Sequence, residues 1–339
     1  MNPRERELID GLSCPDGGVI EVLSNIKGDL LLLGAGGKTG HGLALMAKRA
    51  LEQAGSTHKA IAVSRFSSAG SRDIFEADGI DTIACDLVDD AAVRDLPDAS
   101  DIVYLAGQKF STTGNSGTTW LLNCYLPGVV AQRWPDARFA VYSSGNVYPF
   151  SNATTHGPRE GAPVDPIGEY AQSVLGRERV FEYFSEANQT PMVMIRLNYA
   201  NETRYGVLVD LGQKILAGEP IDVTQGYVNL IWQGDSNLVT FRCLSMASCP
   251  PAILNLAGPD VLAVRDLATK LAAMLGRDAC FVGEESDTAL ISDGSACWER
   301  FGGPSVDVDE MIERIVDWLM AGGPTLNKPT HFEVRDGKF

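Results

Sequence analysis

The sequence of 339 residues predicts an α/β fold in which helices cover both faces of a parallel sheet. Apolar segments of strand length alternate with helical segments from residue 30 to residue 197. These strand segments are apolar almost throughout, which is typical of strands buried on both faces. Strands are expected at 30–33, 59–64, 80–85, 101–105, 138–143 and 191–197, and helices at 89–96, 118–132 (with a break at Pro127) and 169–186.

The segment 28–51 combines an apolar strand, a glycine turn and an amphipathic helix. Without a Cβ atom, glycines let the backbone turn tightly and let a pyrophosphate approach, while the N–H groups at the start of the helix face the phosphates. This order predicts a dinucleotide-binding, Rossmann-type doubly wound sheet, with an ordinary strand-to-helix turn as the alternative. The predicted contacts of the turn are Gly34, Gly36, Gly37, Lys38, Thr39 and Gly40.

The end of the second strand bears on the choice between NAD and NADP. An acidic residue there binds the ribose 2′-hydroxyl, whereas an arginine accommodates a 2′-phosphate. Ser64 and Arg65 stand at this position, and Lys38 is a possible second cation. We therefore expect NADP as the cofactor, with NAD as the second choice, although a solvated arginine at a strand end is the plainer interpretation of Arg65.

Two further strand ends supply candidate cofactor contacts. Asp86 can accept a hydrogen bond from the adenine amine while Leu87 covers a face of the ring, but Asp86 can equally cap the following helix. After the fourth strand, the small residues Ala106 and Gly107 leave space for a ribose.

Composition excludes several classes of partner. The formal net charge of −16 opposes binding to nucleic acid or to an anionic membrane. No apolar run approaches the ~20 residues that cross a bilayer, and the first residues lack the apolar core of a signal peptide. The seven cysteines include no CxxC pair and the four histidines are never four residues apart, so no metal site is expected. We expect a cytoplasmic protein with a small-molecule substrate.

The domain organisation is expected to follow the chain. Residues 1–27 form an N-terminal extension with a helix around 19–26, and residues 28–200 form the dinucleotide-binding domain. Residues 201–322 form a smaller, mixed substrate lobe, with a strand near 227–232 returning to the main sheet. The polar tail at 323–339 is either a loose end or an arm lying over a neighbouring surface.

Several segments, taken in order, resemble the extended short-chain dehydrogenase/reductase superfamily, in its branch of NAD-dependent epimerases and dehydratases. The resemblance covers residues 28–320. It rests on GAGGKTG from Gly34, CDLVD from Cys85, YLAG from Tyr104, VYSSGNVYP from Val141, EGAPVDPIGEYAQSV from Glu160, MIRLNYAN from Met194, VNLIWQGD from Val228, NLAGP from Asn255 and VRDLATKLAAMLGR from Val264.

The resemblance implies which residues are catalytic. Tyr170 exchanges a proton with the substrate oxygen and also contacts the cofactor, while Ser144 positions the same oxygen. Asn198 stands where the family contacts the substrate and the cofactor carboxamide, with a polar loop as the alternative interpretation. From the residues alone, Ser144 can be a helix cap and Tyr170 an amphipathic core residue.

One position departs from the family pattern. Val174 stands where the family has the lysine of its YxxxK motif, and a valine supplies neither a donor nor a charge. Tyr170 is then expected to be a poor base that can still donate a proton, and Arg177, about two turns after Tyr170, is expected to lie too far away to replace the lysine.

The function expected from these features is that of an NAD(P)-dependent oxidoreductase or epimerase acting on a small sugar, polyol or sugar acid. A cofactor-binding sensor or partner-binding protein without redox turnover is one alternative, and a nucleotide-dependent dehydratase or lyase is another. A homodimer through the helices at 118–132 and 169–186 is expected from the same resemblance.

Overall fold

The computed structural model describes residues 2–109 and 114–338, which form two compact units. The first unit comprises Met1–Ser143, Glu169–Ile195 and Asn237–Ile253, and the second comprises Ser144–Gly168, Arg196–Ser236 and Leu254–Phe339. This division differs from the contiguous boundary expected at residue 200. The chain leaves the first unit three times, each time within a strand of the main sheet.

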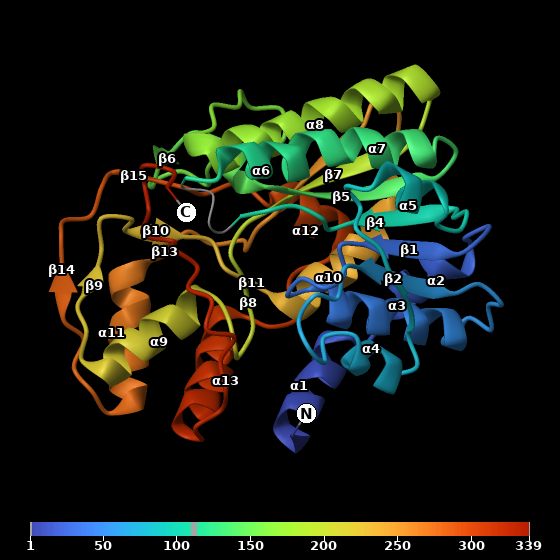
Figure 1. Cartoon of the computed structure of the whole chain (residues 1–339). Helices are drawn as coiled ribbons and strands as arrows, with labels where there is room; N and C mark the ends of the chain where they lie inside the picture. Colours follow the sequence, from blue (N-terminus) through green and yellow to red (C-terminus); the bar gives the residue numbers. More distant parts are fainter. Residues whose placement is uncertain (1, 110–113, 339) are drawn as a thin grey trace. The chain divides into compact units, whose positions relative to one another are not determined.

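The first unit is built on a seven-stranded parallel sheet in the order β12-β7-β5-β4-β1-β2-β3 (Figure 1). The order reverses between β1 and β4, as in a doubly wound sheet. In register, Leu31 of β1 lies opposite Ile61 of β2 and Ile102 of β4. The strands are β1 (Leu30–Leu33), β2 (Ala60–Ser64), β3 (Asp81–Ala84), β4 (Asp101–Tyr104), β5 (Arg138–Ser144), β7 (Met192–Leu197) and β12 (Ala252–Leu256).

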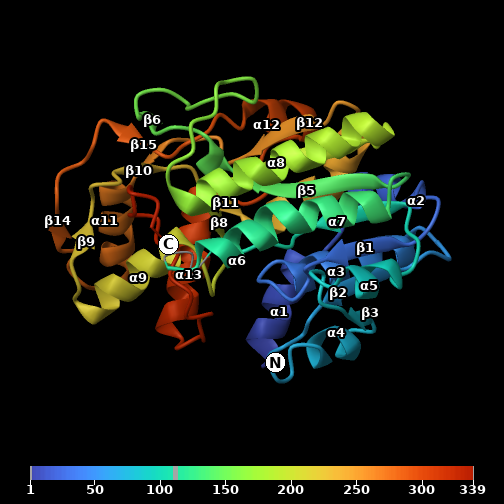
Figure 2. The ribbon, with the colours of Figure 1, turned by 45° about the horizontal axis from the view of Figure 1, so that its top comes forward.

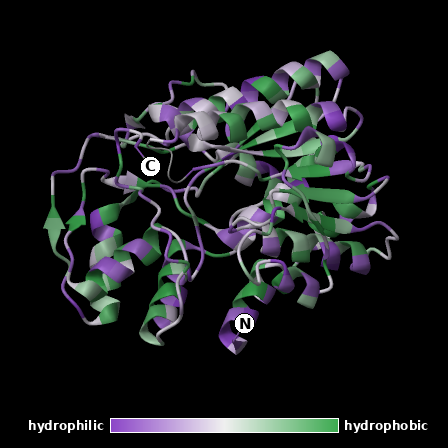
Figure 3. Ribbon diagram, in the orientation of Figure 1, coloured by the Kyte–Doolittle hydropathy of each residue, from purple (hydrophilic) through white to green (hydrophobic). Residues whose placement is uncertain are grey.

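Helices cover both faces of this sheet (Figures 1 and 2), and β1 and β5 are hydrophobic over most of their length (Figure 3). On one face, Leu31 and Leu33 share a buried cluster with Val130 and Phe181. In the described ranges 2–109 and 114–338, no helix is both long and apolar enough to cross a membrane. The helices of this unit are α1 (Pro3–Leu12), α2 (Gly17–Ser24), α3 (Gly40–Gln53), α4 (Asp73–Ala77), α5 (Asp90–Arg94), α6 (Ser116–Trp120), the π-helix η1 (Leu121–Tyr125), α7 (Leu126–Arg133), α8 (Gly168–Asn188), α10 (Gln233–Arg242) and the 3₁₀-helix η3 (Cys243–Met246).

The expected break at Pro127 takes the form of a π-turn. Pro127 lies in the first turn of α7, directly after η1. Because proline has no N–H to donate to the carbonyl of Asn123, the helix widens before it and then continues.

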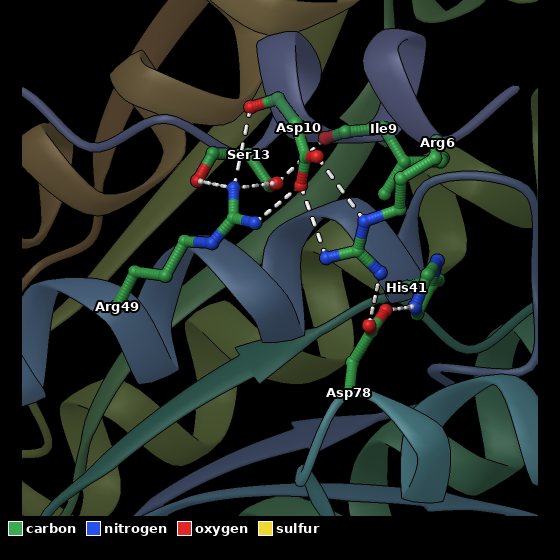
Figure 4. A network of polar contacts seen from close by, with 7 residues as sticks. All are labelled: Arg6, Ile9, Asp10, Ser13, His41, Arg49 and Asp78. Atoms are coloured by element: carbon green, nitrogen blue, oxygen red, sulfur yellow. Dashed lines mark hydrogen bonds and ion pairs between the residues drawn. The ribbon is translucent and has the colours of Figure 1, made fainter. Parts of the chain in front are cut away.

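The N-terminal extension contains one helix more than expected. The helix expected at 19–26 corresponds to α2, and α1 precedes it. Charged side chains attach α1 to the first unit (Figure 4): Arg6 forms ion pairs with Asp10 and Asp78, and Asp10 also pairs with Arg49. Asp78 accepts a second contact from His41 Nε2 at 2.8 Å.

The second unit combines helices with short strand pairs, in which β6 pairs with β15, β8 with β11, β9 with β14 and β10 with β13. Its helices α9, α11 and α13 pack against one another (Figure 1). The strands are β6 (Ser151–Asn152), β8 (Ala200–Asn201), β9 (Ile221–Asp222), β10 (Tyr227–Val228), β11 (Ile231–Trp232), β13 (Leu262–Ala263), β14 (Phe281–Val282) and β15 (Thr288–Ala289), and the helices are the 3₁₀-helix η2 (Gly145–Val147), α9 (Val207–Ala217), α11 (Val264–Leu275), α12 (Ser295–Phe301) and α13 (Val308–Met320).

The strand expected at 227–232 does not return to the main sheet. It divides into β10 and β11, which pair with β13 and β8. The buried Asn229 separates them, because its side chain donates to Asp260 O at 3.3 Å and accepts from Ser292 N at 3.0 Å. The edge of the main sheet beside β7 is formed by β12 instead.

The C-terminal tail packs on the second unit, so it is not a loose end. Thr330 donates from its N–H and its hydroxyl to Asp210 Oδ2, at 2.8 and 2.6 Å. Phe332 is buried. Arg335 donates to Thr288 O at 2.7 Å and lies over the ring of Phe150.

The glycine turn after β1 is set by close backbone contacts. Gly34 has a φ of +86°, and a Cβ there would lie 2.6 Å from the Cα of Ala106. A Cβ on Gly40 would overlap the carbonyl oxygen of Ala35. Gly37 differs, because a Cβ there would meet only the Gly34 carbonyl oxygen, at 3.6 Å.

Gly40→Ala is therefore expected to lower the free energy of unfolding by about 1–3 kcal/mol, since the added methyl group must displace backbone. Gly37→Ala is the matched control in the same turn and is expected to unfold close to the parent protein. Urea unfolding followed by circular dichroism measures both. Equal losses in the two variants would contradict this account of the turn.

Candidate functional site

A cavity of ≈ 270 Å³ lies at the glycine turn of the first unit. Residues that follow the carboxyl ends of β1, β2, β3 and β4 line it. It therefore includes the point between β1 and β4 at which the strand order reverses, where open α/β sheets bind their ligands.

The cavity brings together most of the residues predicted to bind the cofactor. Lys38, Thr39 and Gly40 of the same turn lie outside its lining, as do Tyr170 and Asn198. The predicted residues in the lining are Gly34, Gly36, Gly37, Ser64, Arg65, Asp86, Leu87, Ala106 and Gly107. Their contacts with a cofactor stay predictions.

The start of α3 is shaped for an anion. Gly36 and Gly37 are exposed at the cavity. Thr39, the N-cap residue of α3, makes no side-chain capping hydrogen bond. N–H groups at a helix start that carry no cap can bind a phosphate.

The wall after β2 is richer in polar groups than the sequence analysis expected. Arg65 is exposed, and Ser67, Ser68 and Ser71 join it in the lining. Phe66 has a φ of +47° and packs edge-to-face on Phe75 with ring centroids 5.5 Å apart. The three serines within six residues after Arg65 are the signal by which the sequence could have indicated this wall.

In the wall after β3, the contacts of Asp86 show whether it caps the following helix. Asp86 accepts a hydrogen bond from Val88 N at 3.2 Å, whereas Asp89 caps α5 by accepting from Ala91 N and Ala92 N. The interpretation of Asp86 as the helix cap is therefore wrong. Leu87 is buried beside Asp86. The sequence analysis missed the neighbouring lining residues Cys85 and Val88.

The wall after β4 is held by the π-turn. Gly107 has a φ of +155°. The next residue, Gln108, donates its N–H to Asn123 Oδ1 at 2.9 Å and accepts from Asn123 Nδ2 at 3.0 Å. Leu105, Leu122 and Leu126 also line the cavity, and no local sequence signal singled them out.

The two predicted catalytic residues belong to different units. Ser144, the last residue of β5, is 7% exposed, and its hydroxyl donates to Asn146 Oδ1 at 2.8 Å and accepts from Asn146 N at 3.2 Å. It therefore caps the 3₁₀-helix η2, as the alternative interpretation held. Tyr170 lies in the first turn of α8 and is half-buried. Their catalytic roles stay predictions.

The neighbourhood of Tyr170 on α8 contains no lysine at the expected position. Val174 is completely buried. One turn further, Arg177 donates to Tyr142 O at 2.8 Å and to Asn123 Oδ1 at 2.6 Å. Asn198 lies in the second unit, where its N–H donates to Leu256 O at 2.9 Å and its side chain to Ser292 Oγ at 3.2 Å.

Solved structures with the same fold include several sugar-nucleotide enzymes. UDP-glucuronic acid 4-epimerase from Bacillus cereus, in complex with UDP-glucuronic acid and NAD, is 15% identical and has a TM-score of 0.70, over 86% of this chain and 99% of that chain. The dTDP-glucose 4,6-dehydratase DesIV from Streptomyces venezuelae, with NAD bound, is 18% identical and has a TM-score of 0.72, over 86% and 97% of the two chains. MoeE5, in complex with UDP-glucose and NAD, is 17% identical and has a TM-score of 0.69, over 87% and 99%.

A comparison with curated proteins gave no match. The sequence profile of the NAD dependent epimerase/dehydratase family matches residues 30–223, which include the glycine turn, the cavity residues, Ser144 and Tyr170. Because this match spans more than half of the chain, the chain belongs to the NAD dependent epimerase/dehydratase family and is an enzyme that uses a nicotinamide cofactor.

Proposed function

We propose that the chain binds NADP in preference to NAD, in the cavity at the glycine turn, and acts on a hydroxyl or carbonyl group of a small sugar derivative. The observation that carries the cofactor preference is the position of Arg65, exposed in a cavity lining that also includes three serines. The similar solved structures contain NAD, so the preference for NADP rests on this chain's own residues.

The residues present fit a dinucleotide. Gly37 leaves open space at the turn, and the uncapped start of α3 would hold a diphosphate. Arg65 with Ser67 and Ser68 would bind a 2′-phosphate, since a guanidinium forms charge-assisted hydrogen bonds with phosphate oxygens. Asp86 would accept from the adenine amine.

The chemistry on the substrate is assigned to Tyr170 and Ser144. A bound nicotinamide supplies a hydride donor or acceptor. The Tyr170 hydroxyl would exchange a proton with the substrate oxygen, and the Ser144 hydroxyl would position that oxygen. Because Val174 provides no positive charge near Tyr170, proton donation to a carbonyl is favoured over proton removal from an alcohol.

Nucleotide-linked sugars are the first substrates to test. Such a sugar is part of the enzyme's name or is the bound molecule in three similar structures. The family includes epimerases and dehydratases as well as net oxidoreductases. In the first two classes the cofactor returns to its starting redox state, so the absorbance of NADPH after turnover separates them from a net reductase.

Arg65→Glu is expected to weaken NADPH binding by about tenfold or more, because it removes a charged hydrogen bond to the 2′-phosphate, and to leave NADH binding within about twofold. Fluorescence titration with each reduced cofactor measures this. Arg72→Glu is the matched control, since Arg72 lies on the same side of the fold but pairs with Glu76 outside the cavity lining. An Arg65→Glu variant that bound NADPH as tightly as the parent protein would refute the preference.

Tyr170→Phe is expected to lower turnover by about 10²–10⁴-fold on any substrate found in a screen of nucleotide-linked sugars and small carbonyl compounds, since it removes the proton-transferring group. Tyr183→Phe, on the exposed side of the same helix, serves as the control. Turnover unaffected by Tyr170→Phe would remove Tyr170 from the mechanism.

We also infer a homodimer through α6, η1, α7 and α8. Large hydrophobic side chains are exposed on these helices, with Trp120 39%, Tyr125 49% and Tyr183 65% exposed. Tyr183→Asp is expected to convert a dimer to a monomer in light scattering after gel filtration, since it places a charge in an apolar contact. Met320→Asp, equally exposed on α13, is expected to leave the mass unchanged. A parent protein that elutes as a monomer would exclude the dimer.

A further inference from the structure

Arg177 is a buried cation whose hydrogen-bond acceptors are neutral. Its side chain lies on α8 and is 6% exposed. Nη1 donates to the main-chain oxygen of Tyr142 and Nη2 to the amide oxygen of Asn123. Within the described residues, Nε has no hydrogen-bond partner.

In the part of the chain that the structure describes, no anionic side chain pairs with this guanidinium. Among the described ranges 2–109 and 114–338, no carboxylate lies within 4.0 Å of the guanidinium nitrogens. Burial raises the pKa of the Tyr104 hydroxyl and of the Cys124 thiol, so both neighbours are neutral at pH 7. The adjacent Glu178 accepts from Ser143 Oγ at 2.5 Å. An uncompensated buried charge is costly, which points to an anion that binds nearby.

The guanidinium lies directly behind the wall of the cavity. Gly107 lines the cavity, and a Cβ on Gly107 would overlap Nη2 of Arg177 and lie 3.0 Å from its Cζ. The guanidinium therefore occupies the space that a side chain at position 107 would need. One glycine separates the charge from the cavity.

Asn123 holds the guanidinium against this wall. Its amide oxygen accepts from both Arg177 and Gln108, and its amide nitrogen donates to Gln108 O and to Ser173 Oγ at 2.9 Å. The guanidinium of Arg177 and the backbone after β4 are thus both hydrogen-bonded to the side-chain amide of Asn123. The side chain cannot turn away from the wall without breaking these contacts.

We propose that Arg177 is a positioning residue whose charge acts across Gly107 on an anionic nucleotide in the cavity. Arg177 lies three residues after Val174, so the two side chains leave the same face of α8. The inference rests on the proposed function, because it takes the cavity as the nucleotide site. It gives Arg177 a role different from that of the family's lysine, which Arg177 is expected to lie too far away to replace.

The test compares anionic and neutral ligands in Arg177→Met, Arg177→Gln and Arg177→Lys, with Arg179→Met as the control on the exposed face of α8. Calorimetry measures binding of NADPH, ADP and adenosine. We expect the two neutral variants to bind NADPH and ADP about tenfold or more weakly, while adenosine binding changes less than about twofold, since only charged ligands feel the lost charge. Arg177→Lys and Arg179→Met are expected to stay close to the parent protein.

A merely structural role would weaken adenosine and ADP binding alike, and that result, or unchanged NADPH binding, would overturn the proposal. Thermal unfolding identifies any variant that does not fold, and Arg177→Gln, which keeps a donor toward Tyr142 O, carries the test if Arg177→Met fails. If the parent protein binds ADP but no nicotinamide cofactor, the proposed function fails while ADP still tests Arg177. If it binds neither, both are overturned.

Discussion

The structure of the first unit depends on the close passage of backbone at the turn after β1. Gly34 meets the backbone of Ala106, and Gly40 meets that of Ala35, so neither position has room for a side chain. These contacts bring the loops after β1 and β4 together at the point where the strand order reverses. Gly34 and Ala106, which make the first of these contacts, both line the cavity.

Missing side chains serve two purposes around this cavity. At Gly37 the space beside the backbone is open, so a ligand can approach. At Gly107 the space is filled from behind by the guanidinium of Arg177, so the protein itself uses it. The same residue type therefore leaves space for a ligand at one wall and for a cationic side chain at the other.

The two ends of the chain are held by polar contacts rather than by extensions of the sheet. Near the N-terminus, Asp78 joins Arg6 of α1 to His41 of α3. Near the C-terminus, Asp210 accepts two hydrogen bonds from Thr330. Burial raises the pKa of Asp210, because removal from water disfavours the charged form of this carboxyl group. Segments that look like loose ends by composition are thus parts of the folded units.

The sequence by itself determined six of the seven strands of the main sheet, the glycine turn and several of the cavity residues at strand ends, because each depends on apolar runs and small residues that are neighbours in the chain. Only the tertiary structure decided that 227–232 leaves the main sheet, that Ser67 and Ser71 face the cavity, and that Arg177 lies behind Gly107. These arrangements join residues far apart in the chain, and their energy comes from packing and burial, which local periodicity does not record.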